Sequence, residues 1–497
     1  MFDPIAQAFA DEPAIIQGER RWTFKEMNDR ANALAHGLQG LGASGGAKAL
    51  WISPNDEKVL LFGHAARKCG MVAVPLPYRF TPEEMEYVIN DSDAFLVFCA
   101  PDYRTTLEGL NTPNLKLIVD FDQAEELIAD NPADPIEDAH EGMGASMIYT
   151  SGTTGKPKGA LRTQTDLGVV AALIGELGIG REVHITTGPL YHSGPGAFAA
   201  LSQLLGGSVV ILEKFDPNRW LELVDEHRCT FTFTAPTQLK RIVAQPDEVR
   251  AKYDTSSLKC VIANAAPVPY ALKKQWIEAF GEGHLFEVYG STELGVDTVL
   301  RPEDQLRKPG SCGKPYGGVE IRIITEDGRD AEADEPGVMW IKSPGAFDEY
   351  HKAPEKTEGT KLADDPAWQT VGDVAYRDEE GYFYICDRAN DMIISGGMNI
   401  YPAEIEGVLH AHPAVLDAGV FGVPNEEWGE QVHAVVQLKQ GESATQDELE
   451  THCRQTLSGY KVPRSWEFRD ELPRTESGKL LKRQLRDEHW GDRTSRV

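Results

Sequence analysis

Cysteine is scarce and scattered in this chain. The seven cysteines stand at positions 69, 99, 229, 260, 312, 386 and 453, and no C-x-x-C pair occurs. An odd number without such a pair argues against a disulfide framework and against a cysteine-rich zinc site. We therefore expect a protein of a reducing compartment, the cytoplasm.

Long apolar runs are also missing. No stretch approaches the roughly 18 residues that a spanning helix needs. The N-terminal segment MFDPIAQAFADEPA has no basic region followed by an apolar one, which is the pattern of a signal peptide. We expect neither an integral membrane segment nor an exported precursor.

Positive charge is in short supply. The chain has 49 Lys and Arg against 78 Asp and Glu, a formal net charge of −29. A surface this acidic repels nucleic-acid backbones, so we expect no nucleic-acid partner. If the protein binds another polyanion, it must do so with a few local Lys and Arg side chains and backbone N–H groups.

What is present is the pattern of a soluble α/β protein. Of the 497 residues, 41% are hydrophobic and 26% are charged, and a chain of this length should form several subdomains. Strand-like runs at 47–53, 71–77 and 94–98 alternate with helix-like segments at 56–70 and 81–92. Further strand-like runs are 115–120, 208–213 and 260–264. This alternation predicts mostly parallel sheets covered by helices.

A smaller unit follows the large one. Residues 129–142 predict an acidic loop, and 325–337 an exposed turn that leads into a strand at 338–342. The last part should hold a helix at 402–411, strands at about 415–423 and 430–438, a helix at 445–457 and a short strand near Trp466. We expect a large N-terminal domain, residues 1–388, and a small mobile α+β domain, residues 389–497.

One glycine-rich stretch could bind an oxyanion. Residues 149–159 read YTSGTTGKPKG and hold three Gly, four hydroxyl side chains and two Lys. Glycine permits the backbone conformations that turn N–H groups inward, and hydroxyls and Lys suit phosphate oxygens. The segment is not a P-loop, because Pro157 follows Gly155-Lys156 where Ser or Thr is required. From these residues alone, an ordinary surface turn after the strand-like run 145–150 stays open.

Four further motifs accompany this stretch. They are YGSTE (289–293), TVGDVAYRDEEGYFYICDR (370–388), the segment 387–406 and PRTESGK (473–479). In order and spacing, the set resembles the motifs of the adenylate-forming superfamily, which includes acyl-CoA synthetases, peptide-synthetase adenylation domains and luciferases. The resemblance covers nearly the whole chain and is strongest to a stand-alone acyl-CoA synthetase.

The resemblance implies a two-step reaction that uses ATP, Mg²⁺ and coenzyme A. A carboxylate first attacks the α-phosphorus of ATP, giving acyl-AMP and pyrophosphate, and the thiol of coenzyme A then displaces AMP. The phosphate contacts would come from Thr150, Ser151, Gly152, Thr153, Thr154, Gly155, Lys156 and Lys158. Glu293 would bind Mg²⁺, a hard ion that prefers oxygen ligands.

The same resemblance assigns the rest of the nucleotide site. Tyr289 would stack on adenine, with Ala265, Ala266, Pro267, Gly290 and Ser291 beside it, and Thr292 would reach the α-phosphate. Asp373 and Arg388 would bind the ribose. The alternatives are a core aromatic for Tyr289 and a structural salt bridge for Asp373 with Arg388.

Catalysis would depend on both domains. By the resemblance, Lys479 bridges the attacking carboxylate and the α-phosphate during adenylation. The small domain would then rotate and bring Gly396 and Gly397 to the thiol tunnel. The hinge position is Asn390, where the family usually has Asp or Lys, so this chain has an amide in place of a charge at the pivot. His192 would position the acid's carboxylate or gate the acyl pocket.

The acid itself is only broadly indicated. Amino-acid-activating relatives place an Asp near position 192, and this chain has none in 191–198 or 232–238. We expect a fatty, aromatic or bulky apolar acid, and small residues such as Gly194, Gly196 and Gly290 would leave room for it. Two alternatives stay open: an adenylating enzyme that loads a separate carrier protein, and a catalytically silent nucleotide- or acyl-binding protein. The sequence is compatible with a homodimer.

Overall fold

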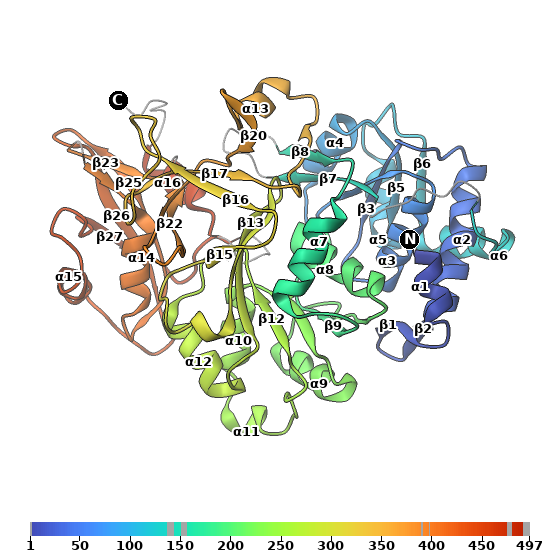
Figure 1. Cartoon of the computed structure of the whole chain (residues 1–497), viewed down its shortest axis with the longest axis horizontal. Helices are drawn as coiled ribbons and strands as arrows, with labels where there is room; N and C mark the ends of the chain where they lie inside the picture. The colour runs from blue at the N-terminus through green and yellow to red at the C-terminus, as the bar shows by residue number, and fades with distance from the viewer. Residues whose placement is uncertain are drawn as a thin grey trace.

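The protein is seen in a computed structural model that describes residues 2–136, 144–150, 157–388, 391–396, 398–474 and 480–490. Four β-sheets organise it, with the N-terminal sheets at the right and centre of Figure 1 and the C-terminal sheet at the left. The predicted α/β class, with a large N-terminal and a small C-terminal part, is confirmed. Within the described ranges no helix has the length and apolar character needed to cross a membrane.

The largest sheet has nine strands in the order β15-β14-β13-β12-β11-β9-β10-β1-β2. Neighbours from β13 to β1 pair in parallel, whereas β2, β14 and β15 add antiparallel strands at the ends. The strands are β1 (Pro13–Gln17), β2 (Arg20–Thr23), β9 (Val183–Thr186), β10 (Ser208–Val210), β11 (Phe231–Thr234), β12 (Cys260–Ala263), β13 (Leu285–Ser291), β14 (Gly295–Leu300) and β15 (Lys314–Pro315).

The second sheet has seven strands in the order β18-β8-β7-β4-β3-β5-β6. Neighbours from β7 to β6 are parallel, and β8 and β18 are antiparallel additions. The strands are β3 (Lys48–Ile52), β4 (Val72–Pro75), β5 (Ala94–Cys99), β6 (Leu117–Asp120), β7 (Ala145–Thr150), β8 (Lys158–Arg162) and β18 (Glu349–Tyr350). The strand-like runs predicted in this region are therefore strands.

Helices flank these two sheets and share a core between them. Phe24, Phe62, Phe98 and Val209 belong to one cluster of buried side chains, and the rings of Phe62 and Phe98 stack 4.4 Å apart. The predicted helix at 81–92 begins after Thr81, whose side chain forms a capping box with Glu84. The helices are α1 (Phe2–Ala8), α2 (Phe24–Gly40), α3 (Glu57–Lys68), α4 (Pro82–Asp91), α5 (Pro101–Glu108), α6 (Phe121–Asp130), α7 (Leu167–Leu177), α8 (Ser193–Leu204), α9 (Pro217–His227), α10 (Pro236–Val243), α11 (Asp247–Arg250), α12 (Tyr270–Phe280), η1 (Pro302–Asp304) and α13 (Pro354–Glu358).

A third sheet is antiparallel throughout, which the expected βα alternation did not include. Its order is β19-β20-β17-β21-β22, and β16 pairs with β17. Connections such as 378–382, between β21 and β22, are too short for the dozen or so residues of a parallel crossover. The strands are β16 (Glu320–Ile324), β17 (Gly337–Lys342), β19 (Lys361–Leu362), β20 (Asp365–Gln369), β21 (Asp373–Arg377) and β22 (Phe383–Arg388).

The C-terminal part has its own sheet and two small cores. The sheet order is β24-β23-β26-β25, and β27 pairs in parallel with β26. Side chains alternate across it: Val420 and Ala434 pack in one core, Phe421 and Val435 in the other. The elements are β23 (Ile393–Ser395), β24 (Met398–Ile400), α14 (Pro402–His410), β25 (Val415–Asn425), β26 (Gly429–Leu438), α15 (Gln446–Arg454), β27 (Ser465–Phe468) and α16 (Lys482–Trp490). The predicted α+β pattern of this part is confirmed.

Candidate active site

The glycine-rich stretch connects two antiparallel strands. β7 ends at Thr150 and β8 begins at Lys158, and these two residues pair across the hairpin. Because the chain returns as a strand and does not enter a helix, this hairpin differs from a P-loop in structure as well as in spacing. The predicted phosphate contacts Ser151, Gly152, Thr153, Thr154, Gly155 and Lys156 lie outside the described residues.

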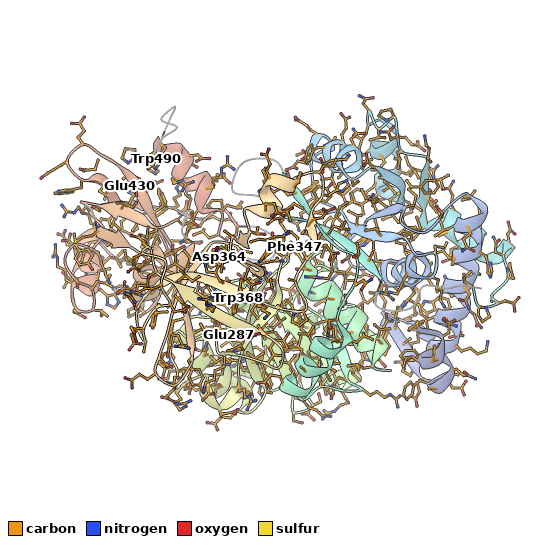
Figure 2. All side chains as sticks on the ribbon, turned by 45° about the horizontal axis from the view of Figure 1, so that its top comes forward. Glu287, Phe347, Asp364, Trp368, Glu430 and Trp490 are labelled. Atoms are coloured by element: carbon orange, nitrogen blue, oxygen red, sulfur yellow. The ribbon has the colours of Figure 1, made fainter. Side chains whose placement is uncertain are left out.

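Glu293 lies in the turn between β13 and β14 and accepts hydrogen bonds from three other segments of the chain. It is buried, and its Oε1 accepts hydrogen bonds from Tyr350 OH at 2.8 Å and Thr150 Oγ1 at 3.3 Å. Its carbonyl oxygen accepts a bond of 2.6 Å from the amide of Phe347, which Figure 2 labels near the junction of the sheets. Hydroxyls hold this carboxylate and, among the described side chains, no salt bridge neutralises it. Such a group fits a hard divalent cation.

Two basic side chains lie beside this carboxylate. The Nζ of Lys158 lies 5.3 Å from the ring centre of Tyr350. Burial and the nearby Lys356 lower the pKa of Lys158, while the charge of Glu293 acts in the opposite direction. Arg162 Nη2 donates to the carbonyl of Thr292 at 3.2 Å and so fixes the turn that carries Glu293. Local positive charge therefore exists at the strand ends despite the acidic surface.

Thr292 and His192 meet at the start of α8. Thr292 Oγ1 lies 3.3 Å from the hydroxyl of Ser193, the first residue of that helix. His192 is the N-cap residue but its side chain makes no capping bond, and its buried Nε2 has no hydrogen-bond partner among the described residues. Burial lowers the pKa of His192 to about 4, so its ring is neutral at pH 7. A neutral ring with a free nitrogen can bond to a ligand without adding charge.

The predicted adenine wall lines one side of a large cavity. The wall residues that line it are Ala265, Ala266, Pro267, Tyr289, Gly290 and Ser291. Ala265 has a φ of +75°, a left-handed conformation that is uncommon for any residue except glycine. The backbone at this wall is therefore strained, as is frequent at ligand sites.

Two side-chain hydrogen bonds hold that strained turn. Asn264 Nδ2 donates to the carbonyl of Val288 at 2.6 Å, and the amide of Val268 donates to Glu287 Oε1 at 3.1 Å. Glu287, labelled in Figure 2, also forms an ion pair with the fully buried Lys273. The wall is thus fixed from both ends, by the partly buried Asn264 and by the buried Glu287.

Tyr289 also faces the predicted ribose site. Its hydroxyl donates a hydrogen bond to Asp373. Burial and the charge of Asp373 raise the pKa of Tyr289 well above its usual value, so the hydroxyl stays a donor. Arg388 pairs with Asp373 in the register of β21 and β22, but its side chain lies outside the described part. The tyrosine and Asp373 are joined, so both belong to one site.

Asp297 is a neighbouring carboxyl group that the sequence did not single out. It has no exposed surface, and neither of its oxygens has a hydrogen-bond partner among the described residues. Burial, and then the charge of Asp373, raise its pKa well above the usual range. Asp297 is therefore more readily protonated than an ordinary carboxyl group, and its position beside Asp373 adds to that tendency.

The cavity extends from this wall to the C-terminal part of the chain. Its volume is about 2420 Å³, and Asp373 lines it together with Tyr289. The C-terminal side contributes basic residues, Arg474, Lys482, Arg483 and Arg486. Lys482 is paired with Glu406 at 2.9 Å, and burial lowers its pKa less than the charges of Glu406 and Asp387 raise it. Lys482 therefore stays charged beside the cavity.

The small-domain predictions divide between described and undescribed residues. Lys479, Asn390 and Gly397 lie outside the described residues. Leu480, next to Lys479, lines the cavity. Gly396 follows β23, donates its amide to Trp428 O at 2.9 Å and does not line the cavity; Figure 1 shows β23 at the outer left edge, away from β13. The segment after Lys479 thus faces the cavity. Gly396, in the hairpin of β23 and β24 (here called the Gly396 hairpin), does not.

The glycines expected to leave room for the acid are explained by packing. A Cβ at Gly194 would lie 2.3 Å from the Phe233 ring, one at Gly196 2.4 Å from Leu190 O, and one at Gly290 2.0 Å from Gly295 O. These contacts are far below van der Waals distance, so a larger residue would not fit whatever the ligand. Packing alone accounts for glycine at these three positions, and their making room for the acid stays a prediction.

Some residues of the site carried no sequence signal. Tyr350 and Arg162 lie outside the quoted motifs and reach Glu293 or its turn only through the fold. Asp297 stands four residues after Glu293, and nothing in its neighbours indicates burial. No local pattern predicts such contacts, because the partners are far apart along the chain.

Comparison with known proteins agrees with this geometry. A family described as AMP-binding enzyme matches residues 2–351, and one described as AMP-binding enzyme C-terminal domain matches residues 404–479. A feruloyl-CoA synthase of Amycolatopsis sp is 35% identical over 482 residues, 95% of this chain and 95% of that protein. A long-chain-fatty-acid–CoA ligase of Yersinia pestis is 33% identical over 537 residues, 98% of this chain and 93% of that protein.

A solved structure is similar over the same extent. The o-succinylbenzoate CoA synthetase of Bacillus subtilis, in complex with the acyl-adenylate intermediate OSB-AMP, has a TM-score of 0.86 and 29% identity. The match covers 98% of this chain and 97% of that chain. The similarity therefore includes both the large and the small part of the fold.

Proposed function

Because the chain belongs to the AMP-binding enzyme family, we propose that it is an AMP-forming acyl-CoA synthetase. It joins a carboxylic acid to coenzyme A at the expense of ATP, through an acyl-AMP intermediate. The observation that supports this most directly is the contact of Thr150 and Tyr350 with Glu293, which stands two residues after Ser291 of the lining of the cavity that Tyr289 and Asp373 share.

In the first step the acid's carboxylate attacks the α-phosphorus of ATP and pyrophosphate leaves. We assign Thr150, Lys158 and the segment 151–156 to the departing phosphates, Thr292 to the α-phosphate and Asp373 with Arg388 to the ribose. Lys479 would bridge the carboxylate and the α-phosphate, where charge develops and where placed cations act most strongly. Tyr289, held by Asp373, would support the adenine against the wall 265–267.

Glu293 is the residue that would hold Mg²⁺. Its Oε1 is oriented by two hydroxyls, its surroundings are buried, and a carboxylate oxygen suits this ion. When bound, Mg²⁺ neutralises charge on the phosphates. The residues therefore fit the ion, and the chain's contribution is to hold one carboxylate at the phosphate end of the site.

The second step transfers the acyl group to coenzyme A. We propose that the small domain turns about Asn390 and brings Gly396 and Gly397 to the reaction site, with domains bounded near residue 388. The thiol then displaces AMP from the acyl group. The present position of the Gly396 hairpin, away from the cavity, fits the first step.

We propose an aromatic or long-chain apolar acid as the substrate. The Tyr191 and His192 rings lie 4.4 Å apart, the Phe198 and Phe233 rings stack at 5.2 Å, and His192 is neutral. Neither 191–198 nor 232–238 contains a carboxylate that would pair with a substrate ammonium. The relatives named feruloyl-CoA synthase and long-chain-fatty-acid–CoA ligase support the same choice.

We also propose a cytoplasmic location, with ATP, the acid and coenzyme A as the only partners required. All seven cysteines are free thiols, and burial raises the pKa of Cys99 and Cys312 to about 12. Unreactive free thiols suit a reducing compartment. That the enzyme forms a homodimer stays a prediction, which light scattering would test.

The test is a substrate panel of cinnamic, benzoic, medium-chain and long-chain acids. We expect at least one acid to support both ATP–pyrophosphate exchange and coenzyme A-dependent AMP release. Glu293→Gln should lower adenylation about 10²–10³-fold, as does loss of one transition-state contact, while Glu349→Gln, on the exposed side of β18, should not. Acyl-AMP formation that ignores coenzyme A would indicate a carrier-protein ligase, and ATP binding without pyrophosphate release would indicate a silent binding protein.

A further inference from the structure

A group of metal-ligating side chains lies on the C-terminal sheet, and none of its members lines the nucleotide cavity. His433 of β26, Glu467 of β27 and His489 of α16 point their ligand atoms toward one another, all within 4.8 Å. From this geometry we propose that these three residues bind a divalent transition-metal ion, Zn²⁺ by preference, which fastens α16 to the sheet.

The distances are close to those of a tetrahedral zinc site. Zinc–nitrogen and zinc–oxygen bonds of about 2.0–2.1 Å place neighbouring ligand atoms roughly 3.3–3.5 Å apart. Glu467 Oε2 lies 3.4 Å from His489 Nε2 and 3.9 Å from His433 Nε2. Small side-chain adjustments would bring all three atoms to bonding distance, and two His with one Glu is a recurrent zinc ligand set.

His433 supplies the independent indication of a ligand. Its side chain is 4% exposed, and its Nε2 has no hydrogen-bond partner among the described residues. Its other nitrogen, Nδ1, lies 2.8 Å from the hydroxyl of Ser465, which can fix the ring with the Nε2 lone pair toward the group. Metal-bound histidines typically form such a hydrogen bond through the ring nitrogen that does not bind the metal.

The surroundings suit an ion with one open position. Arg469 Nε bonds to Glu467 Oε1 at 2.6 Å and thereby orients the carboxylate with Oε2 toward the histidines. Phe421 packs against both imidazole rings, at 5.2 and 5.6 Å, and shields the group on the core side. On the other side a hollow of about 550 Å³ is lined by Gln431, Ser465 and Glu488, with room for a water as fourth ligand.

An ion here would act on the last helix. Figure 2 labels Trp490, the last residue of α16, at the outer end of the small domain, and its indole nitrogen donates to Gly422 O at 2.9 Å. This bond, the ion pair of Glu488 with Arg469 at 2.6 Å and the packing of Leu485 hold the C-terminal half of the helix to the sheet. The other end of α16 starts three residues after Lys479, so a metal bond at His489 would reduce the freedom of the whole segment.

The experiment uses the full, tag-free and nucleotide-free chain with Zn²⁺ and Co²⁺ alone. In competition with a chromophoric chelator we expect one Zn²⁺ per chain, and a higher melting temperature when it is bound. Co²⁺ should give the intense visible absorption of a four-coordinate site. His489→Gln and Glu467→Gln should weaken binding by more than about 100-fold, and Ser465→Ala by about tenfold, the lower bound for an outer partner.

Two matched controls test whether the effect is local. Asp487→Asn changes an exposed carboxylate on the same helix, and His36→Gln changes a histidine of α2; both should leave binding unchanged. His489 is partly exposed, so its replacement should not prevent folding. The proposal is overturned if the chain takes up no equivalent of Zn²⁺ from the chelator, or if His489→Gln and Glu467→Gln bind it as the unmodified chain does.

Discussion

At the scale of single residues, the site depends on how one carboxylate is held. Glu293 accepts a hydrogen bond from Thr150, which lies 143 positions away in the chain, and another from Tyr350, which lies 57 positions away. Together these bonds orient Oε1 and remove the carboxylate from water. The orientation of this carboxylate can therefore be altered by substituting its hydrogen-bond partners, without changing its charge.

The first prediction concerns Tyr350→Phe, which removes the closer of the two hydroxyls and keeps the ring. We expect the Mg²⁺ concentration for half-maximal adenylation to rise about 10–100-fold, because an outer partner of a metal ligand contributes that much to affinity. Mg²⁺ titration of ATP–pyrophosphate exchange measures this. Tyr253→Phe, in the separate core near α11, is the control and should leave the Mg²⁺ requirement unchanged.

At the scale of elements, close approach of backbones decides where α8 begins. Gly196 lies in its first turn, and its amide bonds to His192 O at 3.1 Å. The carbonyl of Leu190 occupies the space that a side chain at 196 would need. This contact sets the position of Ser193, which touches Thr292, and so connects the helix to the nucleotide site.

The second prediction compares two glycine-to-alanine changes in neighbouring helices. Gly196→Ala should destabilise the protein by roughly 1–3 kcal/mol, the cost of overpacking, and should lower adenylation because α8 must shift. Gly175→Ala, in α7, meets nothing within 4 Å and should instead stabilise it by about 0.5–1 kcal/mol. Urea unfolding with parallel activity assays distinguishes the two, and equal effects would contradict the packing explanation.

At the scale of the whole molecule, the two parts of the chain meet around the cavity. Lys240 Nζ of α10 donates to the carbonyl of Leu416 in β25 at 2.6 Å, a direct bond between them. Leu480 and Lys482 line the cavity while the Gly396 hairpin does not. This arrangement fits the first step of the proposed reaction, and the proposed rotation would supply the second.

The third prediction separates the two half-reactions with Lys479→Ala. Adenylation should lose about 3–4 kcal/mol of transition-state stabilisation, whereas thioester formation from supplied acyl-AMP should be nearly unchanged. Rapid-quench assays of each half-reaction measure this. Lys439→Ala, an exposed lysine of the same domain, should spare both, and an equal loss in both half-reactions with Lys479→Ala would exclude the rotation.

The fourth prediction is that the protein is stable near neutrality and loses stability as the pH falls. Burial lowers the pKa of His184 to about 3, and burial followed by the charge of Arg67 lowers that of His64 to about 3. Both values lie below the unfolded value of about 6.5, so the unfolded chain binds more protons between these limits. The stabilisation is complete above about pH 6.5 and decreases by roughly 1.4 kcal/mol per pH unit for each histidine as the pH falls toward 3.

Urea unfolding at pH 7, 6 and 5 checks this slope. His184→Leu keeps an apolar group of similar size beside Phe231 and should make the slope shallower, since no proton is then taken up on unfolding at this position. His36→Gln, whose histidine lies at the surface, should leave the slope as it is. A variant with His184 removed and an unchanged slope would contradict the assignment.

Much of the fold could be read from short stretches. The strands β3, β4 and β5 and the capped helix α4 were predicted, because apolar periodicity and the Thr81 cap act over a few residues. In the glycine-rich stretch, Pro157 already excluded a P-loop, whereas the return of the chain as β8 was not predicted. The antiparallel third sheet was not predicted, since strand direction follows from which distant strands pair.

The motifs by themselves determined the family resemblance and the expected reaction, because the residues proposed to bind ATP stand in short patterns such as YTSGTTGKPKG and YGSTE. Only the tertiary structure decided that Tyr350 orients Glu293, that burial raises the pKa of Asp297, that Gly196 is small because of Leu190, and that His433, Glu467 and His489 meet. The physical reason is the same in each case. Burial, charge and contact are properties of neighbours in space, and these neighbours come from separate segments that folding brings together.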